Sequence, residues 1–424
     1  MFGMRDTQQW KFKRLTDLAE YLNGYAFKPD DWGKEGLPII RIEQLKNPES
    51  ISDYYSGRIG EKNIIHDGDL IFSWSASLFL RIWQNGKAAL NQHLFKVVEK
   101  EGIDRTFLKQ FIEYYLPEIT KASHGSTMQH ITRKELDRFG AEFPINKPEQ
   151  SKIAEVISTV DRAIEQTEGL IAKQQRIKTG LMQDILTRGI DEHGNLRSEE
   201  THEFKDSSLG RIPVEWDVKM LGDVAQVSSG ITLGKTHSGP NIIEIPYLRV
   251  ANVQDGFLDL SDVKTIRIPS YFFEKYELKV GDVLMNEGGD FDKLGRGTVW
   301  RGEIVQCLHQ NHVFKVRPKK NELVPEFLAN VSSSPYGKAF FVLASKQSTN
   351  LASINSTQLK AFPIPLPSYF EQKEIEKILS QNESRINLFQ ERLMKLRSLK
   401  TALMQDLLTG KVRVTPLLEK KEVQ

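Results

Sequence analysis

The stretch KTGLMQDILT at Lys178–Thr187 occurs a second time as KTALMQDLLT at Lys400–Thr409. Eight of the ten positions are identical, at an offset of 222 residues. Chance does not explain such a match, and internal repeats decide the architecture of a chain before any local pattern does. The same offset relates Glu149-Gln150 to Glu371-Gln372. The repeat therefore extends upstream of the stretch itself.

The offset becomes smaller toward the N-terminal side of each copy, as expected when loops differ in length. NQHLFKV at 91–97 matches QNHVFKV at 310–316 with an offset of 219. Gly68 matches Gly281 at 213, and Trp10 matches Trp216 at 206. The chain of 424 residues is therefore two copies of one unit of about 210 residues.

Each unit changes character along its length. Short β-branched and aromatic runs broken by Gly, Asn, Asp and Pro predict strands and loops, whereas the segments that follow have almost no Gly or Pro and predict long helices. The resulting fold class is a pair of α/β (α+β) domains separated by a long antiparallel helical coiled coil with pseudo-two-fold symmetry. The predicted segments are domain 1 at 1–146, helix 1 at 147–190, a linker at 191–205, domain 2 at 206–367, helix 2 at 368–411 and a tail at 412–424.

Apolar residues recur at alternating spacings of four and three in both helices, which is typical of a seam for one partner helix. The first seam includes Ile153, Ile157 and Ile177, and the second includes Ile375 and Leu407. The alternative is two amphipathic helices that dock separately on their own domains. Asn146-x-x-Glu149 and Ser368-x-x-Glu371 predict a capping box at each helix start.

Composition excludes several classes of protein. The net charge of +2 gives no general basic field, so any nucleic-acid surface must be local. The single cysteine, Cys307, excludes internal disulfides and CxxC metal sites and suits a reducing compartment. No signal peptide or membrane span is predicted, and the expected location is the cytoplasm.

The motifs that an enzyme would need are weak or missing. Gly230-x-x-x-Gly234-Lys235-Thr236 is one residue short of a phosphate loop, and His309-x-x-His312 has no third ligand nearby. Asp290-x-Asp292 lacks the acidic residue that a calcium loop needs at its twelfth position, which is Arg301. We expect no catalytic residue, no metal and no cofactor.

Several weak motifs occur twice in the same order. A Gly-Asp-Leu/Val strand start precedes a Ser-Thr loop, present as HGSTMQHI at 124–131 and KQSTNLASI at 346–354. Phe-Pro-Ile, Glu-Gln and a helix that ends in LMQDxLT follow in both copies. Over essentially its whole length the chain resembles the specificity subunits of type I restriction-modification systems.

The resemblance implies a non-catalytic subunit that reads a bipartite, asymmetric double-stranded DNA target, one half-site per recognition domain. It implies that the helices set the unread spacer and that two methyltransferase subunits dock on them, with restriction-translocase subunits recruited through these. The repeated polar residues off the apolar stripe are the candidate partner-binding residues: Lys178, Thr179, Gln183, Asp184, Lys400, Thr401, Gln405 and Asp406.

Base edges are read by Arg, Lys, Asn, Gln, Ser and Thr, and loops that combine these residues with small ones are candidate DNA contacts. Ordinary solvated turns are the alternative for each loop. In domain 1 the candidates are Ser73, Ser75, Ser77, Arg81, Asn91, Gln92, His93, His124, Ser126, Thr127 and Gln129. In domain 2 they are Asn286, Lys293, Arg296, Gln310, Asn311, His312, Lys346, Ser348, Thr349 and Asn350.

Two other functions stay open at this point. The chain could be the specificity subunit of a modification-only system, or a coiled-coil adaptor whose α/β domains bind protein.

Overall fold

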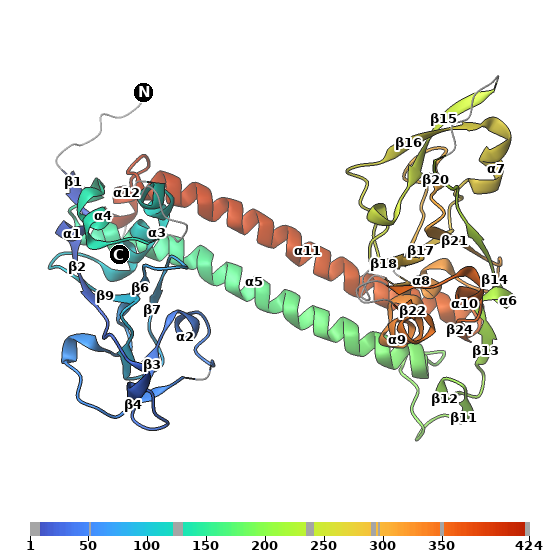
Figure 1. Cartoon of the computed structure of the whole chain (residues 1–424), viewed down its shortest axis with the longest axis horizontal. Helices are drawn as coiled ribbons and strands as arrows, with labels where there is room; N and C mark the ends of the chain where they lie inside the picture. The colour runs from blue at the N-terminus through green and yellow to red at the C-terminus, as the bar shows by residue number, and fades with distance from the viewer. Residues whose placement is uncertain are drawn as a thin grey trace. The chain divides into compact units, whose positions relative to one another are not determined.

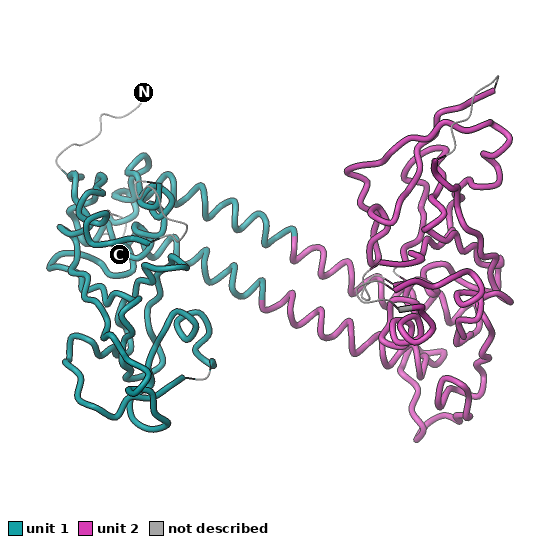
Figure 2. Tube along the Cα trace, viewed as in Figure 1, with its two compact units in different colours: residues 1–168, 391–424 teal, residues 169–390 magenta. Residues whose placement is uncertain are grey.

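The computed structural model describes residues 9–50, 52–121, 130–234, 241–289, 294–295, 297–347 and 352–419. The chain divides into two compact units, coloured separately in Figure 2. Unit 1 consists of residues 1–168 and 391–424, and unit 2 of residues 169–390. Each unit contains one α/β domain together with parts of both long helices (Figure 1).

Domain 1 (1–146) is built on a four-stranded antiparallel sheet with the order β2-β9-β6-β7. Apolar side chains from β6 are fully buried, and Phe107 and Phe111 of helix α3 belong to the same core as Phe72 of β6. The strands of this sheet are β2 (Ala19–Asn23), β6 (Leu70–Ser73), β7 (Phe79–Ile82) and β9 (Leu94–Glu99).

Domain 2, defined as residues 206–367, repeats this sheet with the order β14-β21-β17-β19. Its strands are β14 (Ala225–Ser229), β17 (Val283–Asn286), β19 (Gly297–Val299) and β21 (Val313–Pro318). β14 follows β2 by 206 residues, β17 follows β6 by 213, and β21 follows β9 by 219. These are the offsets of the sequence motifs, so the duplication predicted from the sequence is confirmed strand by strand.

A second sheet in each domain contains one parallel pair of strands. In domain 1 the order is β4-β3-β8-β5, with β3 parallel to β8, and in domain 2 it is β16-β15-β20, with β15 parallel to β20. The strands are β3 (Leu37–Ile40), β4 (Tyr54–Tyr55), β5 (Ile64–Ile65), β8 (Ala88–Leu90), β15 (Ile242–Leu248), β16 (Lys264–Pro269) and β20 (Leu308–His309).

A short antiparallel pair in each domain joins a strand near its start to its last strand. β1 (Trp10–Arg14) pairs with β10 (Gly140–Pro144), and β13 (Asp217–Met220) pairs with β24 (Pro363–Leu366). The smaller helices are α1 (Leu15–Leu18), α2 (Ile42–Lys46), α3 (Arg105–Lys121), α4 (Arg133–Arg138), α6 (Leu221–Val224), α7 (Phe273–Tyr276), α8 (Pro325–Ser333), α9 (Pro335–Ala344), α10 (Ser356–Lys360) and α12 (Thr415–Glu419). The remaining strands are β11 (Phe204–Ser207), β12 (Gly210–Pro213), β18 (Gly288–Gly289), β22 (Lys346–Gln347) and β23 (Ala352–Ser353).

The two long helices are α5 (Lys147–Arg188) and α11 (Tyr369–Leu408). In unit 1, Asp161 of α5 pairs with Lys400 of α11 at 2.6 Å, and Glu168 pairs with Arg397 at 2.7 Å. Later residues of α5 therefore contact earlier residues of α11, and the helix segments run antiparallel. In unit 2, Ile185 near the end of α5 shares a core with Ile375 near the start of α11.

The predicted seam positions are buried or half-buried except one, Ile177, which is wrong. Ile153, Ile157 and Leu407 lie in the core of unit 1. Ile177 is 42% exposed. The prediction failed there because the spacing of apolar residues does not distinguish a seam position from its neighbour on the helix surface. In unit 2 a polar pair lies between the helices, where Asn382 Nδ2 donates to Gln174 Oε1 at 3.1 Å. Coiled-coil packing of the seam stays a prediction.

One buried glutamine in each unit attaches the helix start to the neighbouring domain. Gln150 Oε1 accepts from the Asp104 amide at 2.7 Å, and its Nε2 donates to the Gly102 and Pro144 carbonyls. Gln372 Oε1 accepts from the Val324 amide at 2.8 Å. Its Nε2 donates to two carbonyls, those of Glu322 and Pro367. The glutamine of the repeated Glu-Gln motif therefore makes the same kind of contact between helix and domain in each unit.

The preceding glutamates use their carboxylates in buried ion pairs, so the glutamate half of each predicted capping box is wrong. The serine half is confirmed at Ser368, whose Oγ accepts from the Glu371 amide at 3.2 Å. Glu149 is bound by both Nε and Nη2 of Arg413, and Arg197 lies 2.5 Å from Glu371. Glu371 also accepts from Trp216 Nε1 and the Ile190 amide. Each arginine follows the end of one long helix and holds the start of the other within its unit, which a local motif could not reveal.

Among the residues that the structure describes, no helix is both long enough and apolar enough to cross a membrane. The segment bounds of the sequence analysis stay a prediction as domain limits.

Candidate nucleic-acid interface

A glycine at the end of β2 and of β14 positions one candidate loop in each domain. A Cβ at Gly24 would lie 2.2 Å from the Asn91 carbonyl oxygen, and one at Gly230 would lie 2.0 Å from that of His309. No side chain fits at such distances, so glycine is required. The Gly230 motif considered as a phosphate loop thus has a backbone-packing role at its first glycine.

The turn in domain 1 presents two polar side chains to solvent. The Gln92 amide donates to the Tyr25 carbonyl at 2.9 Å, and Asn91 is only 7% exposed, with its Oδ1 accepting from the His93 amide. Gln92 and His93 are exposed. The His93 ring lies 5.9 Å from the ring of Trp74. Asn91 therefore shapes the turn, while Gln92 and His93 are free to face a ligand.

The corresponding turn in domain 2 has the same backbone bonds but different side-chain exposure and neighbours. The Asn311 amide donates to the Ile231 carbonyl at 2.9 Å, as Gln92 does to Tyr25. Gln310 and Asn311 are half-buried, and His312 is exposed. His312 Nδ1 lies 2.5 Å from Glu287 Oε2. The two turns thus present the same groups, a carboxamide and an imidazole, with different reach and different neighbours.

The two histidines considered as metal ligands have different environments and separate partners. His309 is fully buried, and its Nδ1 lies 2.6 Å from the Val313 carbonyl oxygen. Burial lowers the pKa of His309 to about 4. His312 instead pairs with Glu287. Within the described part of the chain, no group of three or more His, Cys, Asp or Glu residues is arranged to hold a metal ion.

The serine-rich candidates of domain 1 mostly hold their own loop. Ser73 is fully buried and its Oγ donates to the Ser77 carbonyl at 2.5 Å, while Ser75 is 6% exposed. Ser77 Oγ accepts from Lys46 Nζ at 2.7 Å. Arg81 Nη1 donates to the carbonyls of Leu45 and Lys46. Ser73, Ser75 and Arg81 have structural roles in this arrangement, and Ser77 has the most accessible hydroxyl.

Asn286 is the buried counterpart of Ser73 in domain 2. It is 1% exposed, and its Nδ2 donates to the Val253 carbonyl at 2.9 Å. Lys346 on β22 is exposed. The other candidates lie outside the described residues: His124, Ser126, Thr127, Gln129, Lys293, Arg296, Ser348, Thr349 and Asn350.

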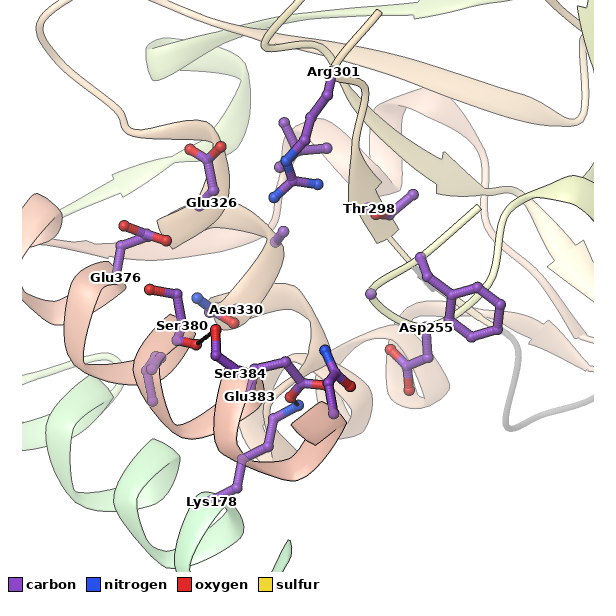
Figure 3. Close-up of a pocket in the computed structure, with 16 residues that line it drawn as sticks. Lys178, Asp255, Thr298, Arg301, Glu326, Asn330, Glu376, Ser380, Glu383 and Ser384 are labelled. Atoms are coloured by element: carbon purple, nitrogen blue, oxygen red, sulfur yellow. Dashed lines mark hydrogen bonds and ion pairs between the residues drawn. The ribbon is translucent and has the colours of Figure 1, made fainter. Parts of the chain in front are cut away.

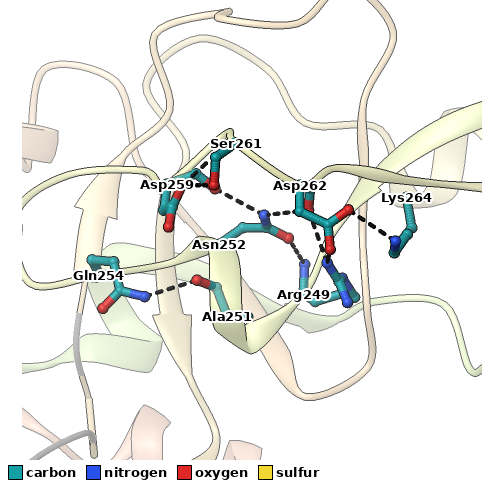
Figure 4. A network of polar contacts seen from close by, with 8 residues as sticks. All are labelled: Arg249, Ala251, Asn252, Gln254, Asp259, Ser261, Asp262 and Lys264. Atoms are coloured by element: carbon teal, nitrogen blue, oxygen red, sulfur yellow. Dashed lines mark hydrogen bonds and ion pairs between the residues drawn. The ribbon is translucent and has the colours of Figure 1, made fainter. Parts of the chain in front are cut away.

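Loop 249–264 of domain 2 is held by a polar network (Figure 4). Asn252 is 2% exposed; its Oδ1 accepts from the Arg249 amide, and its Nδ2 donates to the carbonyls of Asp259 and Asp262. Arg249 Nη2 bonds both the carbonyl and the carboxylate of Asp262. The charged side chains here pair with groups of the same loop, so this cluster stabilises the loop conformation.

The partner-binding candidates on the helices divide into two groups. Lys178 forms an ion pair with Glu383, and Lys400 forms one with Asp161 at 2.6 Å, so both lysines bridge α5 and α11. Asp184 pairs with Arg188 and Asp406 with Lys411 at the surface. The side chains with the most free polar surface are those of Thr179, Gln183, Thr401 and Gln405, all exposed.

The joint between domain and helix differs between the units, although it begins at the same glutamine. In unit 1, Gln110 of α3 is 3% exposed and its Nε2 donates to Ser158 Oγ and the Ala154 carbonyl of α5. At the equivalent positions of unit 2, Asn330 is shorter and Glu376 replaces Ala154.

A cavity of about 420 Å³ opens there in unit 2, lined by α8, α11 and β19 (Figure 3). Burial and the nearby carboxylate of Glu326 raise the pKa of Glu376. The joint of unit 2 therefore includes a cavity whose lining contains Glu326 and Glu376, whereas Gln110 bonds directly to α5 in unit 1.

Comparisons with known proteins agree with this architecture. The family model described as type I restriction modification DNA specificity domain matches residues 7–174 and again 213–397. The chain is 26% identical to the type I restriction enzyme EcoBI specificity subunit of Escherichia coli, over 88% of this chain and 79% of that one. It is 25% identical to the MjaVIII specificity subunit of Methanocaldococcus jannaschii, over 98% and 96%.

Two solved structures have the same fold. An S subunit of a type I restriction-modification system from M. genitalium matches with a TM-score of 0.57 at 16% identity, over 94% of this chain and 96% of that one. A chain from a structural study of complex assembly in the type I system matches with a TM-score of 0.55 at 17% identity, over 95% and 98%.

The fold and the duplicated domains define a DNA-specificity component without catalytic function. The chain belongs to the type I restriction-modification DNA specificity family, whose model accounts for both of its domains.

Proposed function

We propose that this chain reads a bipartite, asymmetric DNA sequence, with one half-site for domain 1 (1–146) and one for domain 2 (206–367). The observation that carries the proposal is the pair of equivalent turns, which share backbone bonds but present Gln92-His93 in one domain and Asn311-His312 in the other. The carboxamides differ in reach, and the histidines lie beside Trp74 in one domain and Glu287 in the other, so equivalent places meet the base edges differently. The location that fits this function is the cytoplasm.

Methylome sequencing of a host that carries the chain with its methyltransferase subunit tests this reading. We expect methylated sites with two defined blocks of different sequence separated by undefined bases. A single continuous block would contradict it. DNA footprinting in the presence of the methyltransferase subunit separates it from a protein-binding adaptor, which would protect no DNA.

The two long helices set the spacer in this proposal. Seven residues added to both α5 and α11, away from the repeated LMQD stretches, lengthen each helix by about 10 Å at 1.5 Å per residue. The spacer should then grow by about three base pairs, since about 34 Å corresponds to one DNA turn. Changed half-site bases with an unchanged spacer would contradict the role of the helices.

Two methyltransferase subunits would dock on the repeated helix surfaces and recruit restriction subunits. The support is that Gln183 and Gln405 are exposed in repeated sequence at an offset of 222. Gln183→Arg or Gln405→Arg alone should reduce the number of bound methyltransferase subunits from two to one, and both together should abolish binding. Mass photometry of the purified complex measures this, with the exposed Arg385→Gln as control. A gene neighbour that encodes a nuclease-translocase would separate a restricting system from a modification-only one.

A further inference from the structure

A cavity of about 490 Å³ in unit 1 lies beside the end of β2 and is lined by three separate parts of the chain. They are the segment Leu22–Ala26, residues between Arg58 and Asn63, and Arg133 of α4. Among the described residues that line it, three are cationic and none is acidic. The cations are Arg58, Lys62 and Arg133. They were not candidates in the sequence because only Lys62 recurs in the second copy, at Lys275.

The three cations are available to a ligand. Arg58, Lys62 and Arg133 are exposed, and within the described part of the chain no carboxylate forms an ion pair with them. Arg133 Nη2 donates to the Tyr21 carbonyl at 2.5 Å, which holds the guanidinium at the cavity wall and leaves its other donors free. In a chain with a net charge of only +2, such an unneutralised group is a local positive site.

The cavity adjoins the candidate recognition turn of domain 1. Tyr25 lines the cavity, and its backbone carbonyl accepts from the Gln92 amide at 2.9 Å. Its backbone amide donates to the Leu90 carbonyl at 2.7 Å. Asn63 Nδ2 donates to the Asn23 carbonyl at 2.8 Å, which holds the segment that carries Lys62 against the same strand end. The segments that carry the cations therefore adjoin the strand end whose backbone also holds Gln92.

We propose that Arg58, Lys62 and Arg133 bind backbone phosphates of DNA and set the register of domain 1 on its half-site. Phosphate contacts from Arg and Lys orient a protein on the duplex, while neighbouring side chains read base edges. The inference rests on the proposed function, which it extends by naming the residues that position this domain. The site is a property of domain 1, because Tyr271 stands at the position of Arg58 in the second copy, and Ser356 at that of Arg133.

The test measures binding of the full chain to three fluorescent duplexes across a range of salt concentrations. One duplex carries the methylated target sequence, one has only its first half-site scrambled, and one is unrelated. The test variant is Arg58→Ala with Lys62→Ala, and the control variant, Lys11→Ala with Lys13→Ala on β1, loses the same charge in the same unit. Arg133 is left unchanged because its bond to Tyr21 contributes to folding.

The double variant should bind every duplex more weakly by a similar factor, roughly 10–100-fold at 0.1 M salt. Its plot of log affinity against log salt should be less steep by about 2, since each phosphate contact contributes about 0.9. Arg58→Lys with Lys62→Arg should restore the slope, and the control should keep it.

A slope equal to that of the wild-type chain, or a loss confined to the target duplex, would overturn the phosphate site. Competition by inorganic phosphate at constant ionic strength, seen with the wild-type chain and absent in the double variant, would overturn it in favour of a free anion. A wild-type chain that binds all three duplexes with equal affinity would instead refute the proposed function. The two failures are therefore distinguishable.

Discussion

Arg413 donates hydrogen bonds to both carboxylate oxygens of Glu149, at 2.7 and 2.9 Å, across 264 residues of sequence. The Glu149 side chain is fully buried, whereas that of Arg413 is 24% exposed. Arg413 also donates to Gln9 Oε1 at 2.6 Å and lies over the ring of Trp10. One guanidinium thus ties the start of α5 to Gln9 and to the first residue of β1 in unit 1.

Arg413→Ala should destabilise unit 1 strongly, because it leaves the buried Glu149 carboxylate without a partner. Breaking a buried pair in this way costs about 3–5 kcal/mol. Differential scanning calorimetry would show a lower midpoint for one unfolding transition. Arg397→Ala, which breaks the exposed pair with Glu168, should change stability by no more than about 1 kcal/mol. Equal effects of the two variants would contradict the role given to burial.

Gln150→Ala and Gln372→Ala should each destabilise the unit in which they lie by about 2–4 kcal/mol. Each removes three hydrogen bonds to backbone groups and leaves those groups buried without partners. Denaturant unfolding followed by tryptophan fluorescence measures the loss, with the exposed Gln175→Ala as control. An effect confined to one unit would show that the two joints are not equivalent.

Acid should destabilise unit 2 through His309. Burial lowers the pKa of His309 to about 4, below the value of about 6.5 expected in the unfolded chain. The unfolded state therefore binds the proton first as the pH falls. Stability is complete above pH 6.5 and is lost progressively between pH 6.5 and 4, by up to about 3 kcal/mol.

His309→Asn keeps a donor near the Val313 carbonyl and should flatten this part of the stability profile. His193→Asn, at a side chain that is 76% exposed, should leave the profile unchanged. Equilibrium unfolding at pH 7, 6, 5 and 4 measures the difference. A profile for His309→Asn that matches the wild type would assign the acid sensitivity to other groups.

The two recognition turns should act independently. Gln92→Ala should relax base preference in one half-site only, and Asn311→Ala in the other only. A lost bidentate base contact costs about 1–3 kcal/mol of discrimination. Methylome sequencing with each variant identifies the half-site that loses definition. Simultaneous loss in both half-sites would argue against one domain per half-site.

The sequence predicted the duplicated domains and the long helices, because repeats and regular apolar spacing can both be recognised in a sequence. The offsets of 206, 213 and 219 located equivalent strands, and the Gly- and Pro-poor segments located α5 and α11. Partners far apart in the chain left no such signal, so Arg413 and Arg197 were not foreseen. Ser73 and Asn286 were predicted to contact DNA but are buried. Composition does not distinguish a polar side chain at the end of a buried strand from one in an exposed loop.

The cationic site was missed for a related reason. Arg58 and Arg133 have no counterparts in the second copy, and only the folded chain brings them together beside Gly24. A search based on duplication finds what the two domains share. Residues that distinguish one domain from the other escape it.

The joints at Gln150 and Gln372 have a consequence for how such a chain can evolve. All six of their partners are backbone amides or carbonyls, which any residue supplies except that proline has no amide to donate. A foreign domain that kept the backbone path at these points would meet the helix with the same atoms. Genetic exchange of a whole domain could then replace the DNA sequence that is read while leaving the attachment to the helix intact.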